Sequence, residues 1–534
     1  MQKLLLISLF VIASITSNAQ VTFQKAYGGT FSENANSVRQ TYDNGYIIAG
    51  TTTSFGSGGR DILVIKTDAF GDTTWTKTFG GAMDNEYGFC VQQTIDSGFI
   101  VSGVASSFAD VAGDMYLIKL NASGDTMWTR TYGGNGYEWG SYVSQTLDGG
   151  YILTGQTPAF GAGGFDAYLV KTDAAGNLSW TKTFGGSGSE IGSAVQQTDD
   201  GGYILTGQID SYGAGFGDFY LLKTDSLANV IWAKAIGVPG EESGLTVKQT
   251  TDGGYVIGGS SESTGVLGKD MCLIKTNSLG DTMFAKTYGG SLIDECYEVI
   301  QTNDGGYIMC GRSFSFTASA DYDVYVVKTN NLGIMQWSKT YGSTGIASAT
   351  DIAYSIDQTN DGGYIIAGET ATLGTGFKNV YLIKTDSLGN SGCNESIPAT
   401  VSSDFHPQVI AAPTLTSVGG ILSFPATQVN SGSSATNICL SNDIADTHSD
   451  FAATIFPNPF SSIVSLSFNI GNEKLISISI IDVTGRIAKS ILANNLSSGN
   501  NSIILDLSEL KNGMYFCKIN SDKNSQTIKL LKNQ

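Results

Sequence analysis

A repeat of about 52 residues constrains this chain more than any other feature. An aromatic residue opens each copy, and Phe23 and Trp75, the first two, are 52 residues apart. The opening aromatics are Phe23, Trp75, Trp128, Trp180, Trp232, Phe284 and Trp337. A lysine inside each copy keeps the same period: Lys66, Lys119, Lys171, Lys223, Lys275, Lys328 and Lys384. Seven copies at a fixed period indicate an array in which each copy forms one supersecondary unit.

Each copy reads as four short strands separated by turns. In one copy, Ser193–Thr198 leads into an Asp-Gly-Gly turn, and the apolar run Tyr203–Thr206 follows. A glycine-rich loop, the strand Phe219–Thr224, a second turn and a strand containing Trp232 complete the copy. Four antiparallel strands in about 50 residues is the period of a propeller blade.

The phasing of the copies indicates a closed ring. The segment Val21–Tyr27 matches the strand that ends a copy, whereas the seventh copy reaches Asp386 without that strand. The N-terminal strand can therefore complete the last copy, which removes two unpaired sheet edges. We predict an all-β chain with a seven-bladed β-propeller over residues 20–390.

Two turn motifs recur in the copies. The first is Asp-x-Gly-aromatic, where x is any residue, and its aspartates are Asp43, Asp96, Asp148, Asp200, Asp252, Asp304 and Asp361. The second, as in Thr67, Asp68, Gly71 and Trp75, resembles the Asp-box and tryptophan-docking motifs of other propellers. Aspartate caps such turns and glycine supplies a positive φ, so repetition favours a structural role over calcium binding.

Acids also recur in the loops that should share one face of the propeller. One set precedes the first strand: Glu33, Glu86, Glu138, Glu190, Glu242, Glu295 and, approximately, Asp351. The other precedes the third strand: Asp61, Asp114, Asp166, Asp218, Asp270, Asp323 and, as an amide, Asn379. Together they form a hypothetical acidic rim that could hold a hard cation or attract a basic partner. Alternatively, each acid pairs with a loop amide or a neighbouring blade.

Aromatic residues accompany these acids in the same loops. They are Phe31, Tyr87, Tyr137, Trp139, Phe160, Tyr212, Phe314 and Phe316. Such side chains could stack on a glycan or form a protein-binding hot spot, while others should pack between blades.

Catalysis has little support in the sequence. Both histidines, His406 and His448, lie outside the repeats, which excludes acid–base chemistry by histidine within them. The five arginines form no cluster of the kind with which a sialidase binds the carboxylate of its substrate. No pair of carboxylates departs from the repeat in a way that would mark a glycosidase site, so we predict a protein that is not an enzyme. We also predict no cofactor, and calcium is the one ion that the acids could bind. The net charge of −19 disfavours nucleic acid and anionic membranes as partners.

The N-terminus has the pattern of a secretory signal peptide. Lys3 precedes the apolar run Leu4–Ile15, and small residues lead to a cleavage site between Ala19 and Gln20. The apolar run is too short to cross a bilayer, and no other stretch is long enough, so we predict no transmembrane segment.

Seven scattered cysteines form no Cys-x-x-Cys pair. Cys393 and Cys439 flank the segment after the repeats, and we predict a disulfide between them. Residues 391–450 are rich in Ser, Thr and Pro, which favours an extended, weakly structured linker.

The last segment, residues 451–534, has six or seven expected strands, typical of a β-sandwich. The strands are expected at Ile463–Asn469, Ile476–Asp482, Arg486–Leu492, Asn501–Asp506, Gly513–Asn520 and Gln526–Lys532. Its motifs include Pro457, Asn458, Pro459, Asp482, Gly485, Arg486, Gly513 and Tyr515. In this order they resemble the type A C-terminal sorting domain of the Bacteroidetes type IX secretion system.

The resemblance implies an export route through the periplasm to the outer cell surface or the medium. The partners it implies are the outer-membrane translocon and its sortase, and the repeats resemble glycine-rich propeller repeats common in such cargo. Our leading hypothesis is a secreted propeller that acts as a binding or scaffold module for a glycan or protein. The alternatives are an extracellular polysaccharide hydrolase and a purely structural surface spacer.

Overall fold

The computed structural model contains β-strands and no helix in the part of the chain that it describes. The described residues are 20–82, 84–108, 113–262, 268–317, 321–342, 350–419, 421–423, 428–430, 434–441, 453–457, 460–470, 475–482, 486–494, 499–520 and 525–532. The predicted signal peptide lies outside them. No helix among them could cross a membrane.

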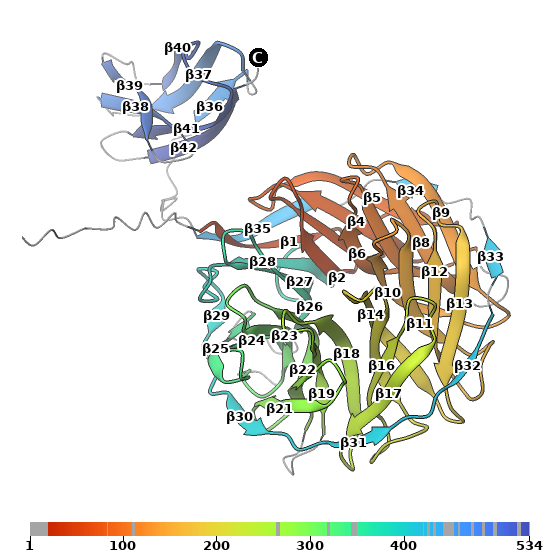
Figure 1. The fold of residues 1–534 in the computed structure, drawn as a ribbon. Coiled ribbons are helices and arrows are strands. Elements are labelled where there is room, and N and C mark those ends of the chain that lie inside the picture. Colours follow the sequence, from red (N-terminus) through yellow and green to blue (C-terminus); the bar gives the residue numbers. More distant parts are fainter. Residues whose placement is uncertain are drawn as a thin grey trace, which may run out of the picture. The chain divides into compact units, whose positions relative to one another are not determined.

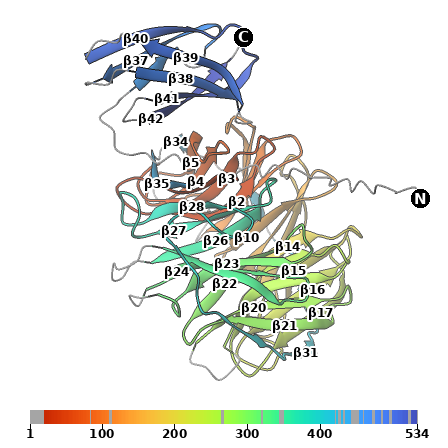
Figure 2. The ribbon, with the colours of Figure 1, turned by 90° about the vertical axis from the view of Figure 1, so that its left-hand side faces the viewer.

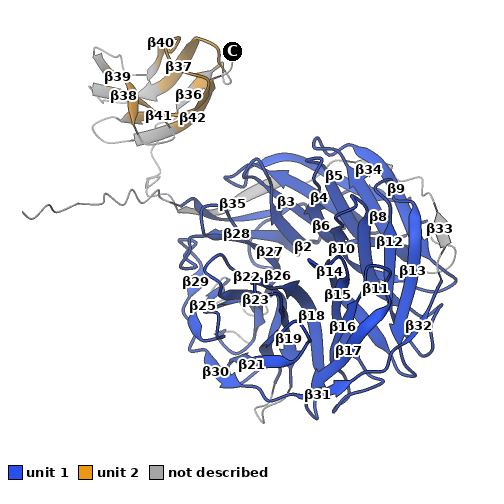
Figure 3. Cartoon of the chain, in the orientation of Figure 1, with its two compact units in different colours: residues 1–441 blue, residues 442–534 orange. Residues whose placement is uncertain are grey.

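The chain divides into two compact units, residues 1–441 and 442–534 (Figure 3). The first unit contains seven antiparallel sheets of five strands each. The innermost strands are β2 (Glu33–Gln40), β6 (Glu86–Gln93), β10 (Trp139–Gln145), β14 (Glu190–Gln197), β18 (Glu242–Gln249), β22 (Asp294–Gln301) and β26 (Asp351–Gln358). The second strands are β3 (Tyr46–Thr52), β7 (Phe99–Ala105), β11 (Tyr151–Thr157), β15 (Tyr203–Ile209), β19 (Tyr255–Ser261), β23 (Tyr307–Ser313) and β27 (Tyr364–Thr370).

The third strands carry the repeated lysine. They are β4 (Asp61–Thr67), β8 (Asp114–Leu120), β12 (Asp166–Thr172), β16 (Asp218–Thr224), β20 (Asp270–Thr276), β24 (Asp323–Thr329) and β28 (Asn379–Thr385). The fourth strands are β5 (Thr73–Gly80), β9 (Thr126–Gly133), β13 (Leu178–Gly185), β17 (Val230–Gly237), β21 (Thr282–Gly289), β25 (Met335–Tyr341) and β1 (Thr22–Gly28). The last of these, β1, pairs with β28, so the start of the chain completes the seventh sheet, as the phasing predicts.

The sheets follow one another around a ring (Figure 1). Each innermost strand contacts the innermost strand of the next sheet, and β26 contacts β2 to close the cycle. Second and third strands are buried along almost their whole length, as their continuous apolar runs predict. Apolar side chains of neighbouring sheets meet in shared clusters, so the core lies between the sheets.

Aromatic residues of the fourth strands connect neighbouring sheets. A Cβ added to Gly124, Gly176 or Gly280, each in the last turn of a sheet, would come within about 3 Å of a tryptophan ring of the preceding sheet. These glycines have φ values of 74° to 80°. In the second motif, glycine therefore allows both the turn and the close approach of the ring.

Seven short strands after the repeats, β29 to β35, lie on the outside of the ring, and we call them the belt. Its strands are β29 (Glu395–Ser396), β30 (Val401–Asp404), β31 (Gln408–Ala411), β32 (Leu415–Ser417), β33 (Ile421–Ser423), β34 (Gln428–Asn430) and β35 (Ser434–Ser441). Each adds a fifth strand to one sheet, in the reverse order of the sheets along the chain. The pairing of β31 with β17 is visible in Figure 2.

The belt corrects the prediction of a weakly structured linker over residues 391–450 for the strands from Glu395 to Ser441, while residues 442–450 lie outside the described residues. The outer edge of every fourth strand offers unpaired backbone groups, and even two to four residues of extended chain can satisfy them. Cys393, just before the belt, is disulfide-bonded. The side chain of Cys439 is not described, although its backbone pairs with Gln24, whose Nε2 donates to the Cys393 carbonyl at 2.5 Å. The Cys393–Cys439 pairing stays a prediction.

The second unit has two antiparallel sheets, β36-β37-β40 and β39-β38-β41-β42. Its strands are β36 (Ala453–Phe456), β37 (Ile463–Ile470), β38 (Leu475–Asp482), β39 (Ile487–Asn494), β40 (Gly499–Asp506), β41 (Gly513–Asn520) and β42 (Ser525–Lys532). Leu466 of one sheet and Ile480 and Ile519 of the other belong to the same buried core. All six predicted strands are present here, within two residues at each end.

Candidate functional site

The predicted acidic rim is not an exposed surface. The acids before the innermost strands are at most 1% exposed: Glu33, Glu86, Glu138, Glu190, Glu242, Asp294 and Asp351. Those before the third strands lie beside them, with Asp61, Asp114, Asp166 and Asp218 at most 8% exposed and Asp270 and Asp323 half-buried. The two sets do share one face, because residues 86 and 138 donate backbone N–H groups to Arg60 and Gly113 of the preceding sheet.

Each acid of the first set bonds the loops around it. Glu138 accepts hydrogen bonds from the Gly134 N–H at 3.0 Å and the Thr157 hydroxyl at 2.8 Å. Glu86 accepts from the Gly81 and Ser107 N–H groups at 2.9 and 2.8 Å. These local bonds agree with the alternative that each acid pairs with loop groups of the protein and does not form an exposed binding surface. A ligand could reach them only if the loops opened.

One assignment was wrong by one residue. In β22, Asp294 occupies the buried position and accepts from the Gly290 N–H at 2.7 Å. Glu295 instead faces the other side of the strand and accepts from Arg312 Nε at 2.5 Å. Adjacent residues of a strand point to opposite faces, so a shift of one residue exchanges a fully buried acid for a partly exposed one that pairs with Arg312.

The two sets of acids meet as carboxyl pairs at the sheet junctions. A Cβ on Gly80 would come within 3 Å of both the Asp61 and the Glu86 carboxylates, and Gly289 lies between Asp270 and Asp294 in the same way. Burial, with a smaller contribution from the neighbouring carboxylate, raises the pKa of Asp270 to about 7. The same two causes raise the pKa of Asp323 to about 7. At the seventh junction Asn379 takes the place of the aspartate beside Glu33.

The turn motifs bind protein groups. Asp148 accepts from the Thr146 hydroxyl at 2.6 Å, the Gly150 N–H at 3.0 Å and Lys171 Nζ at 2.8 Å. Every sheet repeats this ion pair between the turn aspartate and the lysine of the third strand. Among the described residues, no group of three or more His, Cys, Asp or Glu could hold a metal ion. Calcium binding stays an untested expectation.

The residues that differ between copies gather in the space enclosed by the seven innermost strands, which we call the central channel. Each innermost strand pairs with the second strand of its own sheet, and the register of this pairing shifts once. In β2 the shift lies between Ala35 and Ser37, so that Asn36 is bulged, and the other six sheets have the shift at the equivalent position. The bulged residues are Asn36, Phe89, Ser141, Ser193, Leu245, Tyr297 and Tyr354, and all seven line one cavity of about 430 Å³. A bulge redirects a side chain, and here it turns seven residues of five different types toward the axis.

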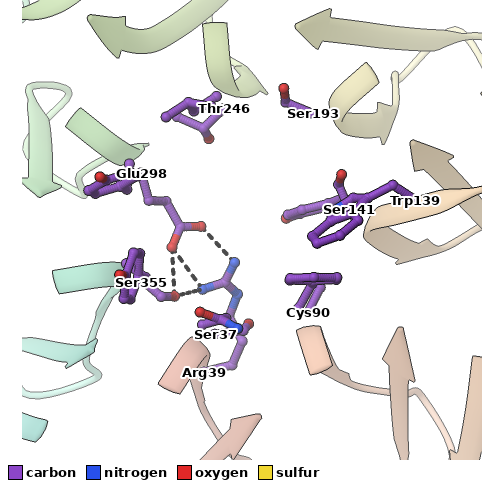
Figure 4. A pocket seen from close by; sticks show the side chains of 15 residues that line it. Ser37, Arg39, Cys90, Trp139, Ser141, Ser193, Thr246, Glu298 and Ser355 are labelled. Carbon is purple, nitrogen blue, oxygen red and sulfur yellow. Dashed lines mark hydrogen bonds and ion pairs between the residues drawn. The ribbon is translucent and has the colours of Figure 1, made fainter. Parts of the chain in front are cut away.

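A charged network lies on one side of the cavity (Figure 4). Arg39 of β2 binds Glu298 of β22 through both nitrogens, with Nη2–Oε1 and Nη1–Oε2 distances of 2.6 and 3.3 Å. Ser355 of β26 donates to Glu298 at 2.7 Å and accepts from Arg39 at 3.0 Å. Although burial alone would raise it, the pKa of Glu298 lies below its ordinary value because of Arg39 and Lys248.

A second polar contact lies among other innermost strands. Lys248 of β18 donates to the Tyr142 hydroxyl of β10 at 2.6 Å, and its ammonium also lies 4.9 Å from the centre of that ring. Gln92 of β6 donates to the same hydroxyl at 3.4 Å. By position along the strands, Arg39, Gln92 and Lys248 form one layer of the channel, three residues past the bulge.

Aromatic side chains lie nearer the other end of the same strands. Trp139 has its ring centre 5.0 Å from Phe89, 5.9 Å from Tyr87 and 5.5 Å from Tyr137. Tyr297 and Tyr354 lie 5.0 Å apart. All six residues are half-buried.

Only some of the predicted loop aromatics belong to this region. Tyr87, Tyr137 and Trp139 do, and Phe314 lies 5.1 Å from Tyr322 beside Arg312. The others pack elsewhere or lie on the outside: Phe160 against Tyr168, Phe316 against Tyr325, Tyr212 in a core cluster and Phe31 exposed. The bulged positions do vary in the sequence, but no local pattern shows that they face the axis.

The motif residues of the second unit shape its turns. Arg486 N–H donates to the Asp482 carboxylate at 3.1 Å, and Tyr515 donates to the Lys511 carbonyl at 2.9 Å. Gly513 has a φ of 147°. Asn458, Pro459 and Gly485 lie outside the described residues.

Residues 454–533 match the family model of the secretion system C-terminal sorting domain. The match supports the predicted resemblance for this unit: a sorting domain of the type IX system implies a protein exported to the cell surface or secreted. No curated protein matches the chain. A similar solved structure is PorZ of Porphyromonas gingivalis, described as an essential surface component of the type-IX secretion system, with 9% identity, a TM-score of 0.28 and coverage of 94% of this chain and 81% of PorZ. So low a TM-score carries no argument here.

Proposed function

We propose that this exported protein is a seven-bladed β-propeller that binds a glycan or protein ligand in its central channel and has no catalytic activity. Seven sheets in a closed cycle of contacts support the propeller interpretation. The observation that carries the binding role is that all seven bulged residues line one cavity and yet are of five different types. Structural repetition would not need that variety, whereas a specific site does.

The local contacts support binding over hydrolysis. Glycosidases need one carboxyl group free to donate a proton and another free to attack or to activate water. Glu298, a carboxylate on the cavity wall, accepts bonds from Arg39, Ser355 and the Ile356 N–H at 3.0 Å. These bonds hold it in the charged form, so it is poorly suited to act as a general acid.

Binding is tested with the full-length protein on a glycan array and against surface proteins of the producing cell. We expect a ligand whose binding is lost in Trp139→Ala and kept in Phe216→Ala, since Phe216 is 91% exposed in a loop. A ligand that binds both variants equally, or no ligand at all, would contradict the channel assignment.

The export route is tested separately by deleting residues 451–534. The shortened protein should accumulate in the periplasm, because it would lack the domain that the translocon recognises. An unchanged amount at the cell surface would refute the route but leave the channel assignment untouched.

A further inference from the structure

Two aromatic walls flank the mouth of the channel. The first consists of Tyr87, Phe89, Tyr137 and Trp139, on and just before β6 and β10. The second consists of Tyr297 and Tyr354, on β22 and β26. In the cycle of sheets, β14 and β18 separate the walls on one side and β2 on the other, so the walls lie on opposite sides of the axis.

The bulged residues between the walls, and Thr246 beside one of them, are uncharged. Asn36 of β2, Ser193 of β14 and Leu245 and Thr246 of β18 line the cavity there, and Ser141 adds a hydroxyl beside Trp139. The Asn36 amide donates to the Gly88 carbonyl at 2.7 Å, which leaves its oxygen toward other partners such as the Asn34 amide at 3.1 Å. The cavity thus combines flat apolar surfaces with hydroxyl and amide groups.

The two charged residues that line the cavity, Arg39 and Glu298, and the arginines around it already have partners within the chain. Arg39 is bound to Glu298, and Arg312 to Glu295, while its guanidinium lies 4.3 Å from the Tyr322 ring. Arg60 donates to the Tyr87 hydroxyl at 2.7 Å. A strongly charged ligand would have to displace these contacts, whereas an uncharged one would not.

We infer that the channel mouth binds a neutral carbohydrate chain between the two aromatic walls. This rests on the proposed function and names the ligand class of the same site. The faces of sugar rings carry C–H groups that pack on aromatic rings, and their hydroxyls match the serine, threonine and asparagine groups between the walls. The cavity of about 430 Å³ lies within the range of small-molecule sites.

The Arg39–Glu298–Ser355 and Lys248–Tyr142 contacts lie one to three residues further along the innermost strands than the bulged residues. A sugar chain would therefore enter from the aromatic end and be recognised by its terminal residues. Protein recognition by a flat or wide surface would not use this depth.

The test is titration calorimetry of the full-length protein with maltohexaose, cellohexaose, laminarihexaose and mannohexaose, and with hexagalacturonate as the acidic counterpart. We expect at least one neutral hexaose to bind. Trp139→Ala and Tyr297→Ala should each weaken that binding about tenfold or more, while Tyr297→Phe and Phe216→Ala should leave it within about twofold.

Three results would overturn the inference. They are binding of hexagalacturonate alone, no binding of any neutral hexaose, and neutral binding that Trp139→Ala leaves unchanged. A surface protein whose binding depends on Trp139, found when no hexaose binds, would preserve the proposed function while rejecting the carbohydrate. If no ligand, carbohydrate or protein, binds in a way that depends on Trp139, the carbohydrate inference and the proposed function are both wrong. Circular dichroism and thermal unfolding of each variant show that the ring is intact.

Discussion

The turns between strands and the walls of the channel follow opposite rules. In every sheet the turn aspartate binds the lysine of the third strand, and the seven pairs are alike to within a few tenths of an ångström. Along the channel the bulged position holds asparagine, phenylalanine, serine, leucine or tyrosine. The repeated contacts stabilise the ring, and the unrepeated positions are free to recognise a ligand. Substitutions at the repeated contacts should therefore lower the free energy of unfolding without changing the affinity for a ligand in the channel.

The largest loss of stability is expected from the belt. If Cys393 is bonded to Cys439, Cys393→Ser together with Cys439→Ser removes a cross-link over 46 residues. The free energy of unfolding should fall by about 2–4 kcal/mol. Denaturant unfolding with and without reductant measures this, and peptide mapping identifies the pair. A map joining Cys393 to another cysteine would refute the pairing.

The repeated turn gives the next effect. Asp200→Ala leaves Lys223, only 5% exposed, without its carboxylate and frees the Thr198 hydroxyl and the Gly202 N–H. We expect a loss of about 2 kcal/mol in denaturant unfolding. The matched control is Asp199→Ala at the exposed neighbouring position, which should change stability by less than about 0.5 kcal/mol. Equal losses in the two variants would contradict the role of the ion pair.

The carboxyl pairs predict a stability that depends on pH. Asp270 and Asp323 have a pKa of about 7 and Asp61 a pKa of about 6 in the folded chain, above the ordinary value of 3.8. The folded state therefore binds more protons between pH 4 and 7, and the free energy of unfolding should rise as the pH falls through this range. The pKa of Asp148 is lowered to about 2, so this group has the opposite effect: below pH 4 its contribution to the free energy of unfolding falls as the pH falls. Thermal unfolding from pH 3 to 8 should show a maximum near pH 4–5.

Asp323→Asn sharpens this prediction, because Asn379 already fills the equivalent position. The variant should be more stable than the natural protein at pH 8, by on the order of 1 kcal/mol, with the gain vanishing near pH 4. A loss of stability at pH 8 would show that the pair is not under electrostatic repulsion.

The smallest effect concerns one turn that departs from the repeat. Ser97 has a φ of 65° where Gly149, Gly201 and Gly253 occupy the same turn. Ser97→Gly should stabilise the chain by up to about 1 kcal/mol, because glycine adopts this conformation without steric cost. Gly201→Ser is the reciprocal variant and should lose a similar amount. Chemical denaturation tests both.

Much of the ring could be predicted because its strands repeat. The strand expected at Tyr203–Thr206 is part of β15, and the pairing of β1 with β28 follows from the phasing. The channel could not be predicted, since a bulge of one residue decides which side chains face the axis. Arg39 and Glu298 are 259 residues apart, and no local pattern brings them together. The belt was missed because its short strands depend on the edges of the ring rather than on their own composition.

Hydroxyl-radical footprinting of the full-length protein, with and without its ligand, tests the central claim most directly. Oxidation of Trp139, Phe89, Tyr297 and Tyr354 should fall when the ligand is bound, because these side chains line the channel. Oxidation of the exposed Phe216 and Phe377 should stay unchanged. Protection of Phe216 and Phe377, with the channel aromatics oxidised as before, would place the ligand on the outer loops and contradict the account.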